Sequence, residues 1–431
     1  MLGKISEKLK LSQAGDYNGS FSQGEWLIAT SLGLLAILFV IVIVSWQGPE
    51  LAVRSIGGRW FQSDGWRVFD DMVDFKSNHY RNVLRPLFSL ISMPLTLLIK
   101  YIFHLSNIQS IWIFNAVCMA IWSGMIFFTV RLAGLSRVGA ITISLFGMIC
   151  GSTIFWFTVP ETYVLSSLSI LFCLFLAAYG IRYKISDFWL ILSGAFCLGT
   201  LLTNWIASLA LVFAYRRPRK AISIGLASLL VVSLGWGLQK VIFPQPASFF
   251  LALKPSAEKE YILNEEQGSP LLSLNTIFIS SIVVPKIDEY DIDIQPTGKR
   301  LTIQRSGLFN SGGFYATLSV IWLVGLGIGS TKIMRTPSLN RFSFVLFATL
   351  AGQVLLHSIY GEETFLYGLH FVPLLVVLAG ASLLSVSRSR YIVLVWILML
   401  LIAINNLGCL QTATTTTNLN QDDGRLSRLK N

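Results

Sequence analysis

Long apolar runs without charges, separated by short polar connectors, make up most of this chain. The first run covers residues 26–45 and carries no charged side chain. A helix of roughly 20 apolar residues crosses a hydrocarbon core of about 30 Å. Similar runs recur at 109–130, 138–157, 162–181, 188–215, 221–242, 313–331, 342–360, 368–386 and 391–409. The pattern predicts an all-α polytopic membrane protein, and the first run is expected to be a retained span because no small-residue cleavage site follows it.

Composition and charge agree with this interpretation. Hydrophobic residues make up 54% of the chain and charged residues only 13%, about half the charged share of a soluble domain. The five cysteines lie in or beside apolar runs without a Cys-x-x-Cys pair, which indicates small buried side chains rather than a disulfide framework or a zinc site. The net charge of +11 collects in short connectors, which is a membrane-topology signal rather than a nucleic-acid surface.

The basic connectors predict the orientation of the chain in the membrane. They are expected to face the cytoplasm together with the N-terminus. The loops 46–108, 158–162, 243–312 and 361–367 then face outside with the C-terminus, so that every acid-rich segment falls on one side. The basic residues are Lys4, Lys8, Lys10, Arg131, Arg137, Arg182, Lys184, Arg216, Arg217, Arg219, Lys220, Lys332, Arg335, Arg341, Arg388 and Arg390.

Two apolar segments are expected not to cross the membrane as single helices. Residues 86–105 contain two prolines, a lysine and a histidine, so an interfacial or re-entrant helix is favoured. Residues 188–215 would form about 42 Å of helix, too short for two full spans, and the polar stretch near Gly199 and Asn204 predicts two half-length helices. About eleven membrane-crossing segments result. The alternative, in which 86–105 spans and 188–215 is one helix, would place two basic connectors outside.

The sequence divides into three predicted parts. Residues 1–312 form the main membrane module, which includes the external loop 46–108 and a re-entrant or external region at 243–312. Residues 313–409 supply C-terminal transmembrane helices. Residues 410–431, rich in threonine and asparagine, are expected to form a disordered external tail.

The first external loop carries an acidic cluster. Asp64 and Arg67, three residues apart, would share one face of a short helix, and a carboxylate at the membrane rim can act as a general base. Asp70 and Asp74 are expected simply to face water, whereas Asp71 stays open between the two roles.

A basic cluster follows in the same loop. His79, Arg81 and Arg85 are the side chains that hold a lipid phosphate through charge-assisted hydrogen bonds. The alternative for all three is an ordinary interaction with lipid headgroups.

Two further external turns carry acids. Glu161 follows Pro160 at the end of a span and either caps the next helix or takes part in chemistry. The turn at 360–370 combines carboxylates with aromatic rings, a mixture typical of a sugar site and also of an interfacial tyrosine belt. Its candidate residues are Glu362, Glu363, Tyr367 and His370.

Several of these motifs resemble those of the GT-C superfamily of integral-membrane glycosyltransferases, in particular the protein O-mannosyltransferase and aminoarabinose-transferase branch. The likeness covers roughly residues 20–385. It lies in Asp64-Gly-Trp-Arg67 with the following Met72, in Arg85-Pro86-Leu87, in the position of Glu161, and in the segment 199–204. The family's lysine is absent at Asn204, and its second acid is replaced by Gly65.

The resemblance implies a GT-C-like fold and an inverting transferase in the plasma (inner) membrane. A hexosyl or pentosyl unit would pass from a polyprenyl-phosphate carrier to an external lipid, glycan or protein acceptor. Asp64 would be the general base, with Asp71 and Glu161 as further catalytic candidates. Substrate binding would fall to Arg67 and to the basic and 360–370 clusters. Neither a cofactor nor a metal is implied, although acid pairs can bind a divalent cation.

Two other functions remain open. A polysaccharide polymerase or ligase would use the same lipid-linked glycans with arginines such as Arg300 and Arg305. A flippase or transporter without covalent chemistry would need charged side chains within its spans, and these runs hold almost none.

Overall fold

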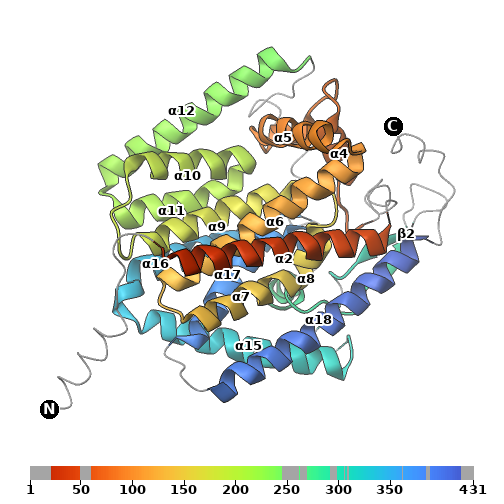
Figure 1. Ribbon diagram of the computed structural model, residues 1–431, viewed down its shortest axis with the longest axis vertical. Helices are drawn as coiled ribbons and strands as arrows, with labels where there is room; N and C mark the ends of the chain where they lie inside the picture. Colours follow the sequence, from red (N-terminus) through yellow and green to blue (C-terminus); the bar gives the residue numbers. More distant parts are fainter. Residues whose placement is uncertain are drawn as a thin grey trace.

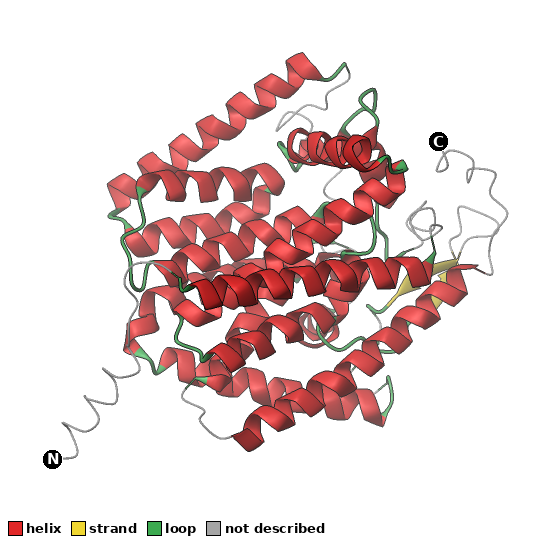
Figure 2. Cartoon of the chain, viewed as in Figure 1, coloured by secondary structure: helices red, strands yellow, loops and turns green. Residues whose placement is uncertain are grey.

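The computed structural model describes residues 21–48, 60–244, 262, 269–291, 299–304, 306–307, 310–361, 363–384 and 389–418. Within these residues the protein is a polytopic bundle of helices (Figures 1 and 2). Seven helical segments are long and apolar enough to cross a membrane: Gln23–Gln47, Asn107–Leu132, Pro218–Ile242, Gly313–Met334, Pro337–His357, Thr364–Leu383 and Tyr391–Thr416. Shorter apolar helices complete the bundle, as the hydrophobic pattern predicts.

The N-terminal helices form a tightly packed layer. Helix α2 (Gln23–Gln47) lies along α6 (Asn107–Leu132), where Gly33 approaches Ala120 so closely that a β-carbon on it would lie 3.4 Å from the alanine methyl. The buried Glu25 pairs with Arg131 Nη2 at 2.8 Å and fixes the register of the two helices. The layer continues through α7 (Arg137–Ile149), α8 (Gly151–Trp156) and α9 (Tyr163–Tyr179).

The connectors divide between the two ends of the bundle. In Figure 1 the start of α2 and the basic turns after α6, α9 and α11 lie at one end. Helix α4 (Gly65–Val73), the turn before α9 and the C-terminal end of α18 lie at the other. The predicted separation of basic connectors from acid-rich loops is therefore present in the fold.

The segment 188–215 is broken, as predicted. Helix α10 (Asp187–Thr200) ends at the extended residue Leu201, and the turn η3 (Leu202–Asn204) leads into α11 (Trp205–Tyr215). Both half-length helices have their outer ends at the basic end of the bundle (Figure 1). Helix α12 (Pro218–Ile242) then packs mainly on α10.

The apolar segment of the first loop forms α5 (Phe88–Phe103), preceded by the turn η2 (Tyr80–Val83). Figure 1 shows α5 nearly end-on, whereas α2, α6 and α9 run across the view. This crosswise orientation is the one expected of an interfacial helix.

A second break lies between α7 and α8, and the region before the C-terminal helices fills it. Helix α14 (Pro270–Asn275) continues into the π-helix η6 (Thr276–Ser280), and the following residues enter the bundle. The amides of Gly151 and Ser152 donate to the carbonyls of Ile282 and Ser281 at 3.0 and 2.9 Å. The re-entrant character predicted for this part of 243–312 is thus observed, whereas the hairpin of β1 (Asp288–Asp291) and β2 (Lys299–Thr302) was not predicted.

The C-terminal helices share the core of the N-terminal ones. They are α15 (Gly313–Met334), η7 (Pro337–Leu339), α16 (Asn340–His357), η8 (Thr364–Tyr367), α17 (Gly368–Gly380), η9 (Ala381–Leu383) and α18 (Ser389–Asn418). Helix α17 is buried almost throughout and packs on α7, α8 and α9, so the predicted division at residue 312 does not separate two packing units.

The predicted tail begins later than expected. Helix α18 runs on to Asn418, and the hydroxyls of Thr412 and Thr415 donate to the carbonyls of Gly408 and Gln411 four residues before them. Residues 410–418 are therefore helical, and 419–431 lie outside the described residues.

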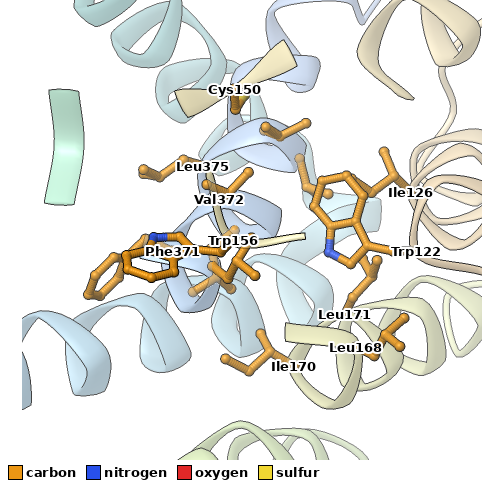
Figure 3. Close-up of a cluster of buried hydrophobic side chains, with 14 of the residues drawn as sticks. Trp122, Ile126, Cys150, Trp156, Leu168, Ile170, Leu171, Phe371, Val372 and Leu375 are labelled. Carbon is orange, nitrogen blue, oxygen red and sulfur yellow. The ribbon is translucent and has the colours of Figure 1, made fainter. Parts of the chain in front are cut away.

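Large aromatic and aliphatic side chains fill the centre of the bundle. Figure 3 shows Trp122, Trp156 and Phe371 among buried leucines and isoleucines. The two indoles still find acceptors, since Trp122 Nε1 donates to Ser167 Oγ at 3.0 Å and Trp156 Nε1 to the Phe365 carbonyl at 2.9 Å. The second of these bonds ties the core to the turn that opens α17, next to the candidate site.

Candidate functional site

Helix α4 places the acidic cluster at the end of the bundle where the acid-rich loops gather. Its Val68, Phe69 and Met72 are buried against the helices beneath it. The acid-bearing positions therefore have fixed directions, because Asp64 precedes the first turn and Asp71 lies two turns later on a similar face.

Asp64 lies at the boundary between the buried site and its surroundings. Its side chain is 39% exposed, forms an ion pair with Arg81 Nη2, and lies 3.6 Å from Arg67 Nη1. The Asp64 amide donates to Glu161 Oε1 at 2.9 Å across 97 residues of sequence. The predicted pairing of Asp64 with a cation is thus present, and Arg81 is its closer partner.

Glu161 is the buried acid of the cluster. Its second oxygen accepts the amide of Thr162 at 3.0 Å, and the charges of Arg81 and Arg85 act on it. Burial raises the pKa of Glu161, and the two arginines with the Thr162 amide oppose that shift. Two acids and two arginines from three segments therefore form one electrostatic unit.

Arg85 is the innermost cation. Its guanidinium lies over the ring of Tyr163, 5.2 Å from the centroid, and its Nε is buried without a hydrogen-bond partner among the described residues. Buried arginine nitrogens are normally paired, so this side chain can accept an anion without giving up an existing hydrogen bond at Nε.

The broken helix holds the arginine-bearing segment in place. Leu202 donates its amide to the Leu84 carbonyl at 3.1 Å, and Leu87 donates to the Gly199 carbonyl at 2.8 Å. A helix break leaves backbone groups unpaired in an apolar surrounding. Here residues 84–87 satisfy them, so the break at Leu201 and the position of Arg85 depend on each other.

An aromatic cluster closes the inner side of the site. The rings of Tyr163 and Tyr367 lie 5.6 Å apart, and His370 lies 5.4 Å from Tyr163. His357, at the end of α16, stacks on Tyr367 at 4.2 Å. Gly361 has φ +110°, and a β-carbon there would lie 2.8 Å from the Tyr367 ring, so only glycine fits.

Two predicted site residues have local partners. His79 is buried, with its ring nitrogens 3.1 Å from Ser89 Oγ and 3.5 Å from the Phe75 carbonyl, and its ring packs on Phe243 at 4.0 Å. Asp71 is also buried and accepts from Ser77 Oγ and the Arg81 amide. A direct role for either in binding or catalysis remains a prediction.

Glu363, the acid of the 360–370 turn that lies within the described residues, does not join the arginines. Glu363 accepts a hydrogen bond from the Thr302 hydroxyl and thereby fastens β2 to the turn. Burial raises the pKa of Glu363 to about 7. Glu362 lies outside the described residues, whereas Tyr367 and His370 reach the site.

Three residues near the site were not selected from the sequence: Tyr163, His357 and Gln239. Tyr163 follows Glu161 by two residues, so its proximity could have been foreseen. His357 and Gln239 are single polar residues near the ends of apolar helices, and such residues are usually structural. Among the described residues, no group of three or more histidines, cysteines or acids has the arrangement of a metal site.

No protein-family model matches the sequence, and no curated protein matches it. Among solved structures, the chain is similar to the crystal structure of ArnT from Cupriavidus metallidurans bound to undecaprenyl phosphate. The match has a TM-score of 0.47 and 12% identity, and it covers 82% of this chain and 75% of that chain.

Proposed function

We propose that this protein is a GT-C-type membrane glycosyltransferase that moves a sugar from a polyprenyl-phosphate carrier to an acceptor outside the membrane. The observation that supports the proposal is the gathering of Asp64, Arg81, Arg85 and Glu161 at one end of a membrane bundle. A rim site with an open carboxylate and a buried cation suits a substrate with a lipid-borne phosphate and a polar acceptor.

Asp64 acts as the general base. The acceptor hydroxyl or amine attacks the anomeric carbon, its proton passes to the Asp64 carboxylate, and a new bond forms from the acceptor atom to that carbon. The bond from the anomeric carbon to the phosphate oxygen breaks, and the lipid phosphate leaves on the opposite face with inversion. Partial exposure gives Asp64 access to the acceptor, and its ion pair with Arg81 orients the carboxylate.

Arg85 holds the phosphate on the inner side. Its guanidinium lies over Tyr163, and its Nε has no hydrogen-bond partner within the part of the chain that the structure describes, so the group is available to an oxyanion. The carboxylate of Glu161 interacts with the positive charges of both arginines and accepts a hydrogen bond from the Asp64 amide. Glu161 therefore couples the base to the phosphate site. Tyr163, Tyr367 and His370 offer the aromatic faces and polar edges that suit a sugar ring.

Transfer of label from a radioactive polyprenyl-phosphate sugar in proteoliposomes tests the proposal. Asp64→Asn retains the shape of the side chain and removes its basicity, so turnover is expected to fall by about 10²–10⁴-fold. The matched control is Asp74→Asn, because the Asp74 side chain is exposed and its carboxylate accepts the neighbouring Lys76 amide at 2.9 Å. Near-normal turnover of Asp64→Asn would refute the base assignment, and no transfer by the native protein with any such donor would refute the function.

Sidedness has its own test. Lys76 is exposed at the acidic end and Arg219 is exposed at the basic end. Lys76→Cys should react with an impermeant maleimide from outside the cell, and Arg219→Cys only after permeabilisation. The reverse pattern would place the site in the cytoplasm and contradict an external acceptor.

A further inference from the structure

Asp64 at the N-cap of helix α4 and Asp71 within that helix both contact the same loop, and only Asp64 is open to a substrate. Asp64 is 39% exposed at its side chain, whereas Asp71 is 1% exposed. They are seven residues apart, which is about two helical turns and places them on a similar face. Both contact the loop that ends in Arg81, so the two acids differ in environment but share a partner.

Both oxygens of Asp71 are hydrogen-bonded to that loop. Ser77 Oγ donates to Oδ1 at 2.9 Å, and the Arg81 amide donates to Oδ2 at 3.1 Å. Asp71 therefore fixes the backbone of Arg81, while Asp64 pairs with its guanidinium. Helix α4 and its N-cap residue thus hold both the backbone amide and the guanidinium of Arg81.

The loop between these contacts needs such support. His79 adopts a left-handed conformation with φ +46°, which is unfavourable for a side chain with a β-carbon. Its imidazole is held by Ser89 Oγ at 3.1 Å and lies 3.8 Å from Asp71 Oδ1. The hydrogen bonds of Asp71 close the loop on either side of this strained residue.

We propose that Asp71 is a positioning residue that sets Arg81 against Asp64 and the carrier phosphate, and that it takes no proton from the acceptor. The role rests on the proposed function, in which Arg81 pairs with the Asp64 base, and on the sequence-based expectation that Arg81 also contacts the lipid phosphate. It departs from the sequence-based expectation that Asp71 is a candidate catalytic acid. It also predicts that hydrogen-bonding capacity, rather than charge, is what position 71 requires.

Asparagine and alanine at position 71 separate the two roles. The oxygen of asparagine can accept the Arg81 amide while its amino group donates to the Ser77 hydroxyl, which is also an acceptor. Alanine can do neither. A general base would lose activity equally in both variants, whereas a positioning residue would tolerate asparagine.

The experiment measures kinetics and hydrogen exchange on the same full-length variants in lipid nanodiscs. Asp71→Asn is expected to keep the donor KM and kcat within about 3-fold, and Asp71→Ala to raise KM about 10-fold or more with a smaller change in kcat. Amide exchange in residues 77–82 should accelerate in Asp71→Ala and stay near the native rate in Asp71→Asn. If Asp71→Ala fails to accumulate, Ser77→Ala replaces it in the test. This variant removes one of the two hydrogen bonds of Asp71, so it should show a smaller rise in KM and a smaller acceleration of exchange.

Loss of kcat in Asp71→Asn to the level of Asp64→Asn, with unchanged exchange in residues 77–82, would overturn the positioning role and make Asp71 catalytic. Unchanged exchange in both Asp71→Ala and Ser77→Ala would overturn it as well. If the native protein transfers no sugar but exchange responds as expected, the proposed function fails while the hold of Asp71 on the Arg81 loop stands.

Discussion

Replacing Gln239 by leucine is expected to loosen the arginine-bearing segment 82–87 while the bundle stays folded. Gln239 is buried on α12 and joins this segment twice. Its Oε1 accepts from Asn82 Nδ2 at 3.0 Å, and its Nε2 donates to the Pro86 carbonyl. The same segment is also joined to the two half-length helices by backbone hydrogen bonds at Leu84 and Leu87.

The size of the effect follows from these contacts. Side-chain hydrogen bonds inside membrane proteins contribute about 0.6 kcal/mol on average and up to about 1.7. Losing both bonds of Gln239 therefore costs about 1–3 kcal/mol of local stability, which corresponds to about a 5- to 150-fold increase in local opening at 1.4 kcal/mol per factor of ten. Amide exchange in 82–87 should accelerate by this factor because it reports local opening.

Hydrogen exchange with mass spectrometry in nanodiscs measures the change, and Leu238→Ala is the matched control. Leu238 is the preceding residue on α12 and is 51% exposed to the lipid side, so its truncation perturbs α12 without touching the segment. Equal acceleration in both variants, or none in Gln239→Leu, would show that α12 does not hold the arginine segment.

Three further predictions concern the breaks and the buried acids. Gly368→Ala should destabilise the fold, because a β-carbon there would lie 1.9 Å from Ser152 Oγ; Ser152→Gly in the same chain should recover much of the lost thermal stability. Asn406→Leu removes hydrogen bonds to the carbonyls of Ile149 and Ile282 and from the Val284 amide. It should lower the free energy of unfolding by about 2–4 kcal/mol in a denaturant titration. Equal denaturation midpoints for the variant and the native protein would show that these three hydrogen bonds do not stabilise the fold. Burial raises the pKa of Glu363 to about 7, so its contribution to stability is full below about pH 4 and is lost as the pH rises through 7. Thermal unfolding of Glu363→Gln should show a smaller decline from pH 5 to 8 than the native protein.

The fold was largely predictable because the local sequence of a membrane helix is enough to identify it. Each apolar run must satisfy its backbone internally, so its length and charge content determine the outcome. The break in 188–215 was also foreseeable, since Thr200, Thr203 and Asn204 interrupt an otherwise apolar run. The structure adds that Asn204 donates to the Ser166 carbonyl at 2.9 Å and accepts from Gln353 at 3.1 Å.

The candidate site was predictable only where its residues are close in sequence. Asp64, Arg67 and Arg81 belong to one loop, and the ion pairs among them follow from that loop. Their link to Glu161 depends on how α4 docks on the turn before α9, and no local pattern encodes this docking. The small sheet was missed for a related reason. Its register pairs residues of mixed type, such as Asp288 with Thr302 and Glu289 with Leu301, and neither strand has an apolar alternation of its own.

The irregular segments of this protein stabilise one another, and this explains why its most charged region can lie at the edge of a lipid-facing bundle. Backbone groups freed by a helix break cannot remain unpaired in an apolar environment. The break at Leu201 is closed by residues 84–87, and the break at Cys150 is closed by residues 281–282 and Asn406. The first closure fixes Arg85, and the second lies beside Ser152, which packs against Gly368 at the start of α17. A substitution that makes the helix continuous at either break would therefore remove the hydrogen-bond partners of the segment that closes it. Such a substitution would displace the residues of the site without changing a charged side chain.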